Sequence, residues 1–202
     1  MATLTGLDTT TQVTSDVAAE LVENGYSFVG RYYSRTTKIA GKKLTAAEAA
    51  IICNAGLQLV AVYEDGPTSY SYFSADRGTA DAQGAIAQAA SVGQPNGSAI
   101  YFTVDYDAAT NEIAGEITNY FQAVREAIGD QFIVGVYGSG ATCQAILDAG
   151  LAGLAWLSCS TAWSGSKTFA NWAIKQGNPE TIFGLNADPD QAIDDFGAFV
   201  VA

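Results

Sequence analysis

Short apolar segments alternate with longer helical segments along most of the chain. Several apolar segments are nearly continuous, such as Leu59-Val60-Ala61-Val62 and Ile100-Tyr101-Phe102-Thr103-Val104. Continuous apolar runs are typical of strands that are covered on both faces, as in parallel sheets. Five helix-like segments each stop at a glycine and are each followed by a strand-like segment, which is a common way for a helix to end.

The pattern predicts eight strands, at residues 3–8, 28–33, 57–64, 99–105, 132–137, 154–159, 172–176 and 184–188. Helices are predicted between the first six strands, at residues 16–24, 46–55, 80–92, 111–128 and 141–149, with a further short helix near 191–199. This alternation predicts an α/β fold, a small (β/α)8 TIM barrel with shortened helices in the C-terminal part and a single domain over residues 1–202. A doubly wound open sheet is the alternative, although no Gly-x-Gly-x-x-Gly follows the first strand.

Composition narrows the chemistry that such a barrel can perform. The 202 residues include 9 Lys and Arg against 21 Asp and Glu, a net charge of −12, so we expect no nucleic-acid partner. The chain has no histidine, which excludes Ser-His-Asp and Cys-His catalysis and histidine-bearing zinc sites. No apolar run approaches the ~18 residues of a membrane helix, so no membrane partner is expected. An enzyme of this composition is expected to run its acid–base chemistry on carboxylates.

Acidic residues gather where the predicted strands end, which is where TIM barrels carry their active sites. The strand-end acids are Asp8, Glu64, Asp105, Asp107 and Asp188, and Gln176 ends the seventh strand. Acids in helices, Glu48 among them, are explained by a solvated face. Crowded carboxylates suit glycoside hydrolysis, which needs a protonated acid and a second carboxylate. They also suit a hard cation such as Ca²⁺, and single acids can cap a following helix.

Aromatic and basic side chains lie beside the same strand ends. Tyr33, Tyr63 and Tyr137 lie at or near the ends of three strands, and Trp163 follows the sixth. Ring faces next to acids suit sugars, whose C–H faces stack on aromatic rings while their hydroxyls bond to polar groups. Arg31 lies two residues before a strand end and is expected to pair with the acids and lower their pKa values.

Several segments resemble a known family. They include Gly6-Leu7-Asp8-Thr9, Gly30-Arg31-Tyr32-Tyr33, Val104-Asp105-Tyr106-Asp107 and Val136-Tyr137-Gly138-Ser139. Together they resemble the bacterial and phage glycoside-hydrolase-like domains of unknown function, compact barrels similar to the family 25 lysozymes (N-acetylmuramidases). The resemblance covers nearly the whole chain and implies an aspartate ending the first strand, matched by Asp8. It also implies an Asp-x-Glu at the fourth strand, where the glutamate acts as general acid and this chain has the shorter Asp107.

The residues and the resemblance predict a muramidase-like glycosidase that acts on peptidoglycan or a related N-acetylated glycan. The predicted catalytic residues are Glu64 as proton donor with Asp107 as runner-up, Asp105 as nucleophile or as the group that orients the acetamido substituent, and Asp8, which tunes the charge. The predicted substrate-binding residues are Asp188, Gln176, Arg31, Tyr33, Tyr63, Tyr137 and Trp163. A non-catalytic cell-wall glycan-binding barrel and a Ca²⁺-stabilised barrel mouth are the alternatives.

We expect a glycan as the partner, a monomer, and neither a cofactor nor a metal in the leading hypothesis. The resemblance implies an extracellular or cell-wall-associated location. No basic segment followed by an apolar one opens the sequence, so no signal peptide is expected within these residues.

Overall fold

Seven strands run parallel and in chain order around a closed barrel. They are β1 (Leu4–Thr9), β2 (Phe28–Tyr33), β3 (Gln58–Tyr63), β4 (Ala99–Thr103), β5 (Ile133–Gly138), β6 (Leu154–Leu157) and β7 (Ile174–Gln176). The eighth barrel strand, β9 (Leu185–Ala192), pairs antiparallel with both β1 and β7, and β8 (Glu180–Ile182) pairs with β9 outside the ring. The computed structural model describes residues 3–201. The predicted small TIM-barrel fold is confirmed, but its last strand runs against the other seven.

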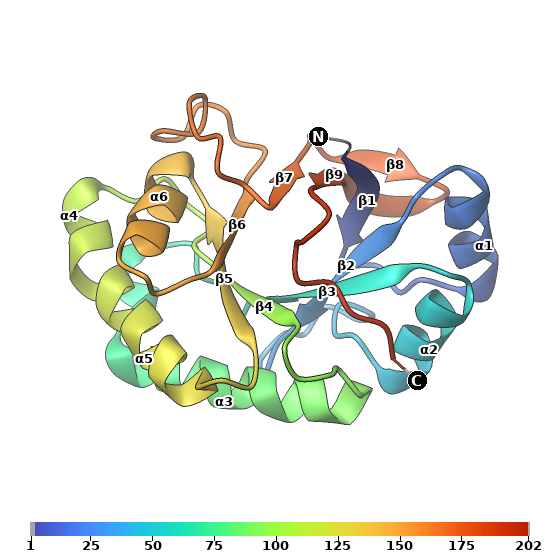
Figure 1. Cartoon of the computed structure of the whole chain (residues 1–202), viewed down its shortest axis with the longest axis horizontal. Helices are drawn as coiled ribbons and strands as arrows, with labels where there is room; N and C mark the ends of the chain where they lie inside the picture. The colour runs from blue at the N-terminus through green and yellow to red at the C-terminus, as the bar shows by residue number, and fades with distance from the viewer. Residues whose placement is uncertain (1–2, 202) are drawn as a thin grey trace.

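Helices cover the barrel on most sides (Figure 1). The longer ones are α1 (Ser15–Glu23), α2 (Ala46–Asn54), α3 (Ala75–Val92), α5 (Thr118–Ile128) and α6 (Gly140–Asp148). Shorter turns are η1 (Tyr70–Tyr72), α4 (Thr110–Glu112) and the π-helical η2 (Ile113–Ile117), which leads into α5. The side between β6 and β1 carries only a loop and the β8–β9 hairpin (Figure 1), so the barrel is least covered there. No helix among residues 3–201 is long and apolar enough to cross a membrane.

The helix predicted near residues 191–199 is wrong. β9 continues to Ala192 because its ladder with β1 extends from Thr9 back to Leu4. The residues that follow cross the end of the barrel where the parallel strands begin. There the Phe196 ring lies 4.6 Å from the Phe28 ring. Gly197 has a φ of +77°, which interrupts a helix, and a Cβ there would clash with the Ala99 side chain.

Side chains alternate between two cores because successive strand residues point to opposite faces. Phe28, Val60, Tyr101 and Trp156 point into the barrel. Their neighbours, such as Val29, pack outward against the helices. Toward the C-terminal ends of the parallel strands, the side chains that point into the barrel are mostly polar. The alternation of inward and outward side chains therefore determines which strand-end residues can reach a common site.

Candidate active site

A cavity of about 140 Å³ opens inside the barrel at the C-terminal ends of the parallel strands. Its lining residues are Asp8, Tyr32, Val62, Glu64, Thr103, Asp105, Tyr137, Trp156, Gln176 and Asp188. The structure thus brings together four of the predicted acids with Gln176 and Tyr137. A hollow of about 430 Å³ along the β8–β9 hairpin shares Asp8, Tyr32 and Asp188 with this cavity. The two hollows are therefore adjacent and have acidic lining residues in common.

Gln176 links the two acids that face each other across β1 and β9. Its Nε2 donates to Asp8 Oδ2 at 2.8 Å and to Asp188 Oδ2 at 3.2 Å, while its Oε1 accepts from the Tyr137 hydroxyl at 2.9 Å. The Tyr32 hydroxyl donates to Asp8 Oδ1 at 2.7 Å. The antiparallel register places Asp188 directly opposite Asp8. The reversed direction of β9 therefore creates this carboxylate pair.

Burial raises the pKa values of three aspartates at the cavity. Burial and the nearby Asp188 raise the pKa of Asp8 to about 7, against the lowering effect of its hydrogen bonds from Tyr32 and Gln176. Burial, and then Asp105, raise the pKa of Asp188. Burial, and then Glu64, raise the pKa of Asp105, although Lys42 opposes the shift. The site therefore includes an acid that changes charge near neutral pH, as acid–base catalysis requires.

Glu64 has a different environment because a lysine reaches it from the loop after β2. Lys42 Nζ lies 2.7 Å from Glu64 Oε1 and 4.6 Å from the centre of the Tyr32 ring. Lys42 is 6% exposed, so water screens this ion pair only in part. Glu64 is therefore the one acid of the cavity with a cationic partner among the described ion pairs. Lys42 carries no signal in the sequence, since it lies in an irregular loop with no periodic pattern.

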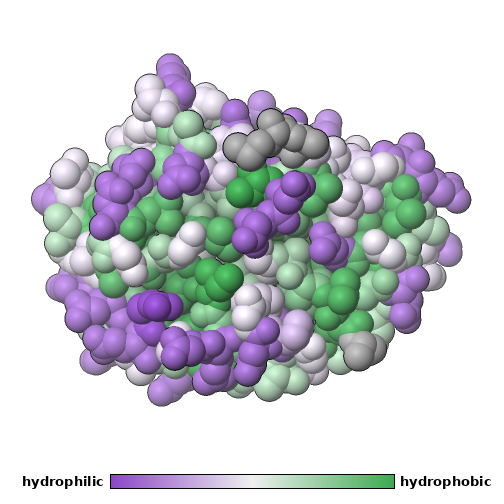
Figure 2. All heavy atoms as spheres, in the orientation of Figure 1, coloured by the Kyte–Doolittle hydropathy of each residue, from purple (hydrophilic) through white to green (hydrophobic). Residues whose placement is uncertain are grey.

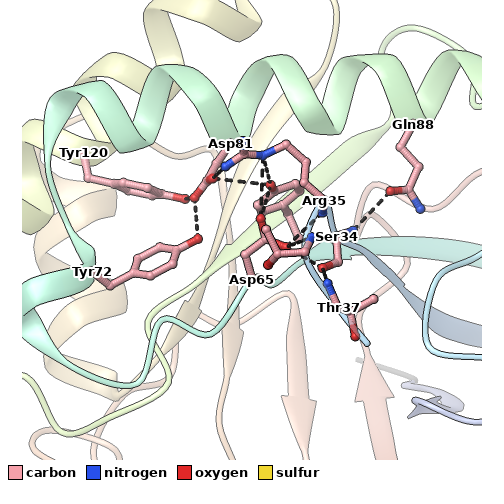
Figure 3. A network of polar contacts seen from close by, with 10 residues as sticks. Ser34, Arg35, Thr37, Asp65, Tyr72, Asp81, Gln88 and Tyr120 are labelled. Carbon is pink, nitrogen blue, oxygen red and sulfur yellow. Dashed lines mark hydrogen bonds and ion pairs between the residues drawn. The ribbon is translucent and has the colours of Figure 1, made fainter. Parts of the chain in front are cut away.

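Two loops beside the site are tied together by a polar network around Asp65 and Asp81 (Figure 3). Asp65 follows Glu64 in the chain, and its Oδ1 accepts from the backbone N–H groups of Arg35 and Thr36 at 2.9 and 3.0 Å. Arg35 Nη2 lies 2.9 Å from Asp81 Oδ1 on α3. Burial opposes ionisation of Asp65, but its hydrogen bonds, first from the Ser34 side chain, lower its pKa overall. The network fixes the loop that carries Lys42 against the strand end that carries Glu64.

The tyrosines in Figure 3 complete this network from the helical side. Tyr72 and Tyr120 direct their hydroxyls at Asp81 and donate to its Oδ2 at 2.6 and 3.0 Å. The Tyr63 hydroxyl donates to Asp65 Oδ2 at 2.9 Å. Asp81 is fully buried, and each of its oxygens has at least one donor, so its carboxylate is satisfied without water.

Gly30 makes room for the site on β2. A Cβ at this inward position would lie 2.7 Å from the Trp156 ring and 2.8 Å from Asp8 Cβ. Trp156 is 1% exposed, and its ring lines the cavity floor. The sequence favours a core position for Trp156, where its ring does lie, but carries no sign that its indole edge belongs to the site.

Three predicted substrate-binding residues lie on the outer face of the barrel. Arg31 forms an ion pair with Glu48 of α2, with 2.7 Å between Nε and Oε1, and both side chains are buried. The Tyr33 hydroxyl donates to Gln94 at 2.7 Å, and Tyr63 belongs to the network of Figure 3. The expected pairing of Arg31 with the site acids is wrong, as is the solvated face expected for Glu48. Strand alternation explains this, because the neighbours of an inward residue such as Tyr32 must face the helices.

Two further predicted residues lie near the site without lining the cavity. Asp107 is exposed, and its Oδ1 accepts from the Ser164 backbone N–H at 2.8 Å. Trp163, next to Ser164, borders a separate surface hollow with Lys167. The contact joins the loop after β6 to the loop after β4. Asp107 therefore does not line the cavity, although the resemblance to the family 25 lysozymes implies an acid there.

The described residues do not support the alternative of a Ca²⁺-stabilised barrel mouth with a cluster of ligands. Among residues 3–201, no group of three or more His, Cys, Asp or Glu is arranged to hold a metal ion.

Comparison with known sequences identifies a shared family. Residues 19–198 match the model of the Rv2525c-like, glycoside hydrolase-like domain. The chain is 37% identical over 196 residues to the uncharacterized protein YbfG of Bacillus subtilis (strain 168), an alignment that covers 89% of this chain and 27% of YbfG. The chain spans about a quarter to a third of the length of the curated relatives it matches.

Solved structures share the barrel. The Mycobacterium tuberculosis Tat-secreted protein Rv2525c aligns with a TM-score of 0.82 and 22% identity over 97% of this chain and 98% of that one. A family GH25 lysozyme from Aspergillus fumigatus aligns with a TM-score of 0.57 and 14% identity over 95% of this chain and 94% of the lysozyme. At such identities the likeness concerns the fold.

Proposed function

We propose that this chain, which belongs to the Rv2525c-like glycoside hydrolase-like domain family, cleaves glycosidic bonds in peptidoglycan or a related N-acetylated glycan. The observation that carries the proposal is the convergence of four carboxyls on one cavity at the barrel mouth. Glycoside hydrolysis needs a protonated carboxyl for the leaving oxygen and a second carboxylate at the sugar ring. The muramidase and lysozyme that share the fold support a glycan as the substrate class.

The surroundings of the acids favour a division of roles that differs from the sequence prediction. Glu64 forms a close ion pair with Lys42, a setting that suits a nucleophile or base better than a proton donor. Burial favours the protonated form of Asp105, whose pKa is raised. We therefore assign proton donation to Asp105 and the ionised role to Glu64. Asp8 and Asp188, joined by Gln176, bind the substrate and tune the charge of the site.

The proposed substrate implies a location outside the cytoplasmic membrane. Rv2525c, which shares the fold, is a Tat-secreted protein. An extracellular or cell-wall-associated location of this chain accords with a peptidoglycan substrate.

The test is mass spectrometry of the soluble products released from purified peptidoglycan. We expect the chain to release muropeptides with reducing N-acetylmuramic acid ends, and Glu64→Gln and Asp105→Asn each to reduce their rate of release by about 10²-fold or more. Asp130→Asn, an exposed substitution at the opposite end of the barrel, is the matched control and should behave as the wild type. Unchanged hydrolysis in both site variants would contradict the proposal.

A second candidate, a glycan-binding barrel without hydrolysis, is favoured by one observation. Asp107, which stands where the resemblance to the family 25 lysozymes implies a glutamate, is exposed and bonded to the Ser164 backbone instead of lining the cavity. Retention of the protein on peptidoglycan with no product formed would support this candidate over the first.

A further inference from the structure

One acid inside the barrel has no part in the proposed chemistry. Asp190 projects inward from β9, two residues beyond Asp188 and opposite Gly6 of β1, and is 2% exposed. Trp156 Nε1 donates to its Oδ1 at 3.1 Å. Its Oδ2 has no hydrogen-bond partner among the described residues. An ionised carboxylate with a single donor at this depth is costly, so the unpartnered oxygen needs an explanation.

The group beside Asp190 is another carboxyl. Asp190 and Asp8 both project inward from paired strands, two positions apart along the ladder, and two neighbouring buried carboxyls do not both ionise at low cost. Asp8 already accepts from Tyr32 and Gln176. The available donors therefore gather on Asp8 and make it the better place for a negative charge. A proton on Asp190 Oδ2, donated toward Asp8, would satisfy the unpartnered oxygen.

No cation within the described part of the chain offsets this arrangement. None of the ion pairs among residues 3–201 involves Asp8 or Asp190. The titratable groups that face the pair are Tyr32 of β2, Glu64 after β3 with its partner Lys42, Tyr101 of β4, Tyr137 of β5, Cys159 after β6 and Asp188 of β9. The elements β6 and β7 contribute the neutral side chains of Trp156 and Gln176. Lys42 pairs with Glu64 and not with Asp8 or Asp190, and the carboxylates nearest to Asp190 oppose loss of its proton.

We propose that Asp190 is a positioning residue that keeps a proton throughout the neutral range and donates a hydrogen bond through it to Asp8, fixing the Asp8 carboxylate at the floor of the cavity. Burial, and then the neighbouring Asp8, raise the pKa of Asp190 well above its usual range, which agrees with the geometry. The site consequently carries one negative charge fewer than its acidic residues suggest. The positioning role rests on the proposed function, whereas the proton itself does not.

Infrared spectroscopy of the whole chain at pH 8 tests the proton directly. We expect the carbonyl band of a protonated carboxylic acid in the wild type and in Asp194→Asn, an exposed acid of the same C-terminal segment, and its loss in Asp190→Asn. Absence of the band from the wild type, or its persistence in Asp190→Asn, would overturn the proposal. If Asp190→Asn does not fold, a ¹³C NMR titration of the aspartate carboxyls in the wild type takes its place. An aspartate carboxyl that is still protonated at pH 8 would support the proposal, and the lack of one would overturn it.

Hydrolysis kinetics then test the positioning role. Asn at position 190 keeps a donor for Asp8, so Asp190→Asn should keep kcat close to that of the wild type. Asp190→Leu removes the donor and should lower kcat on the order of 10²-fold with little change in KM. Equal kcat in the two variants would overturn the positioning role. A wild type without hydrolysis would instead refute the proposed function and leave the infrared result standing.

Discussion

Glu64 and Asp105 share one cavity but differ in what surrounds them. Lys42 lies against Glu64, whereas Asp105 is half-buried and has no ion-pair partner among residues 3–201. The same functional group therefore has two different electrostatic environments in one site, as paired catalytic carboxyls with different roles require. The difference comes from the burial of Asp105 and from the lysine that pairs with Glu64, and the network around Asp65 holds the loop of that lysine in place.

Substrates with different leaving groups separate the two roles. If Asp105 donates the proton, Asp105→Asn should lose about 10²–10⁴-fold in kcat/KM on peptidoglycan. It should keep most of its activity on an aryl glycoside, because a nitrophenolate departs without protonation. Glu64→Gln should lose both activities, since the ionised group acts at the sugar ring. The measurement is kcat/KM on the two substrates, and the opposite pattern would return proton donation to Glu64.

The sequence predicted most of the residues that line the site but also included some that face away. Asp8, Gln176 and Asp188 were identified from their places at strand ends, and all three line the cavity. Strict alternation, counted from the inward Phe28, would have excluded Arg31 and Tyr33. The same count along β9 would have marked Asp190. Nothing comparable in the sequence marked Lys42, because the residues of a long loop do not alternate regularly between two faces.

At the scale of elements, the antiparallel β9 is the feature that the sequence did not predict. Apolar periodicity marks a strand but not its direction, and the short β8 carries only three residues, Glu180–Ile182. The hairpin forms because Phe183, with φ of +46°, and Gly184, with φ of +80°, make a tight turn. Reversal of the last strand places Asp188 opposite Asp8, so the topology itself creates part of the site.

The buried Arg31–Glu48 pair joins β2 to α2 and also binds the backbone segments around them. Arg31 donates to the carbonyls of Thr9 and Gly41, and Glu48 accepts from the Val13 N–H at 2.9 Å. Glu48 therefore does not complete the capping box that its spacing from Thr45 suggests, although Thr45 does accept from the Glu48 N–H at 3.2 Å. The pair holds the outer side of the strands that present Asp8.

Removal of one member of this pair should destabilise the fold strongly. Arg31→Met leaves Glu48 as an uncompensated buried charge and should lower the free energy of unfolding by about 3–5 kcal/mol. Arg31→Met with Glu48→Leu should recover part of that loss, because no buried charge remains. Urea unfolding measures both variants, with the exposed Glu20→Gln as control. A single variant as stable as the wild type would refute the structural role of Arg31.

At the scale of the whole molecule, acidity is distributed between the surface and the barrel. Hydrophilic residues gather along the lower edge of the face in Figure 2, where the outer helices lie, while hydrophobic residues appear nearer its centre. The net charge of −12 makes the surface repel itself, and salt screens that repulsion. Buried acids are screened much less. The two contributions to stability can therefore be separated by ionic strength.

The buried acids predict a fold that is more stable in mild acid than at neutral pH. Burial raises the folded-state pKa of Asp8 to about 7, and it also raises those of Asp81 and Asp190. The folded chain then binds more protons than the unfolded chain above the ordinary aspartate pKa of ~3.9, so the free energy of unfolding falls as pH rises. Asp65 acts in the opposite sense, because its pKa is lowered, and its contribution is lost only in stronger acid.

Urea unfolding between about pH 5 and pH 8 in high salt measures this effect with surface repulsion screened. We expect the free energy of unfolding to decrease steadily over that range, with a slope set by the extra protons held in the folded state. Asp190→Asn removes one of those groups and should make the slope shallower, whereas the exposed Asp194→Asn should leave it unchanged. Stability that stays level or rises with pH in high salt would mean that the barrel acids are ionised. In that case only Lys42 and the hydrogen-bond donors would compensate the negative charge of the ionised acids.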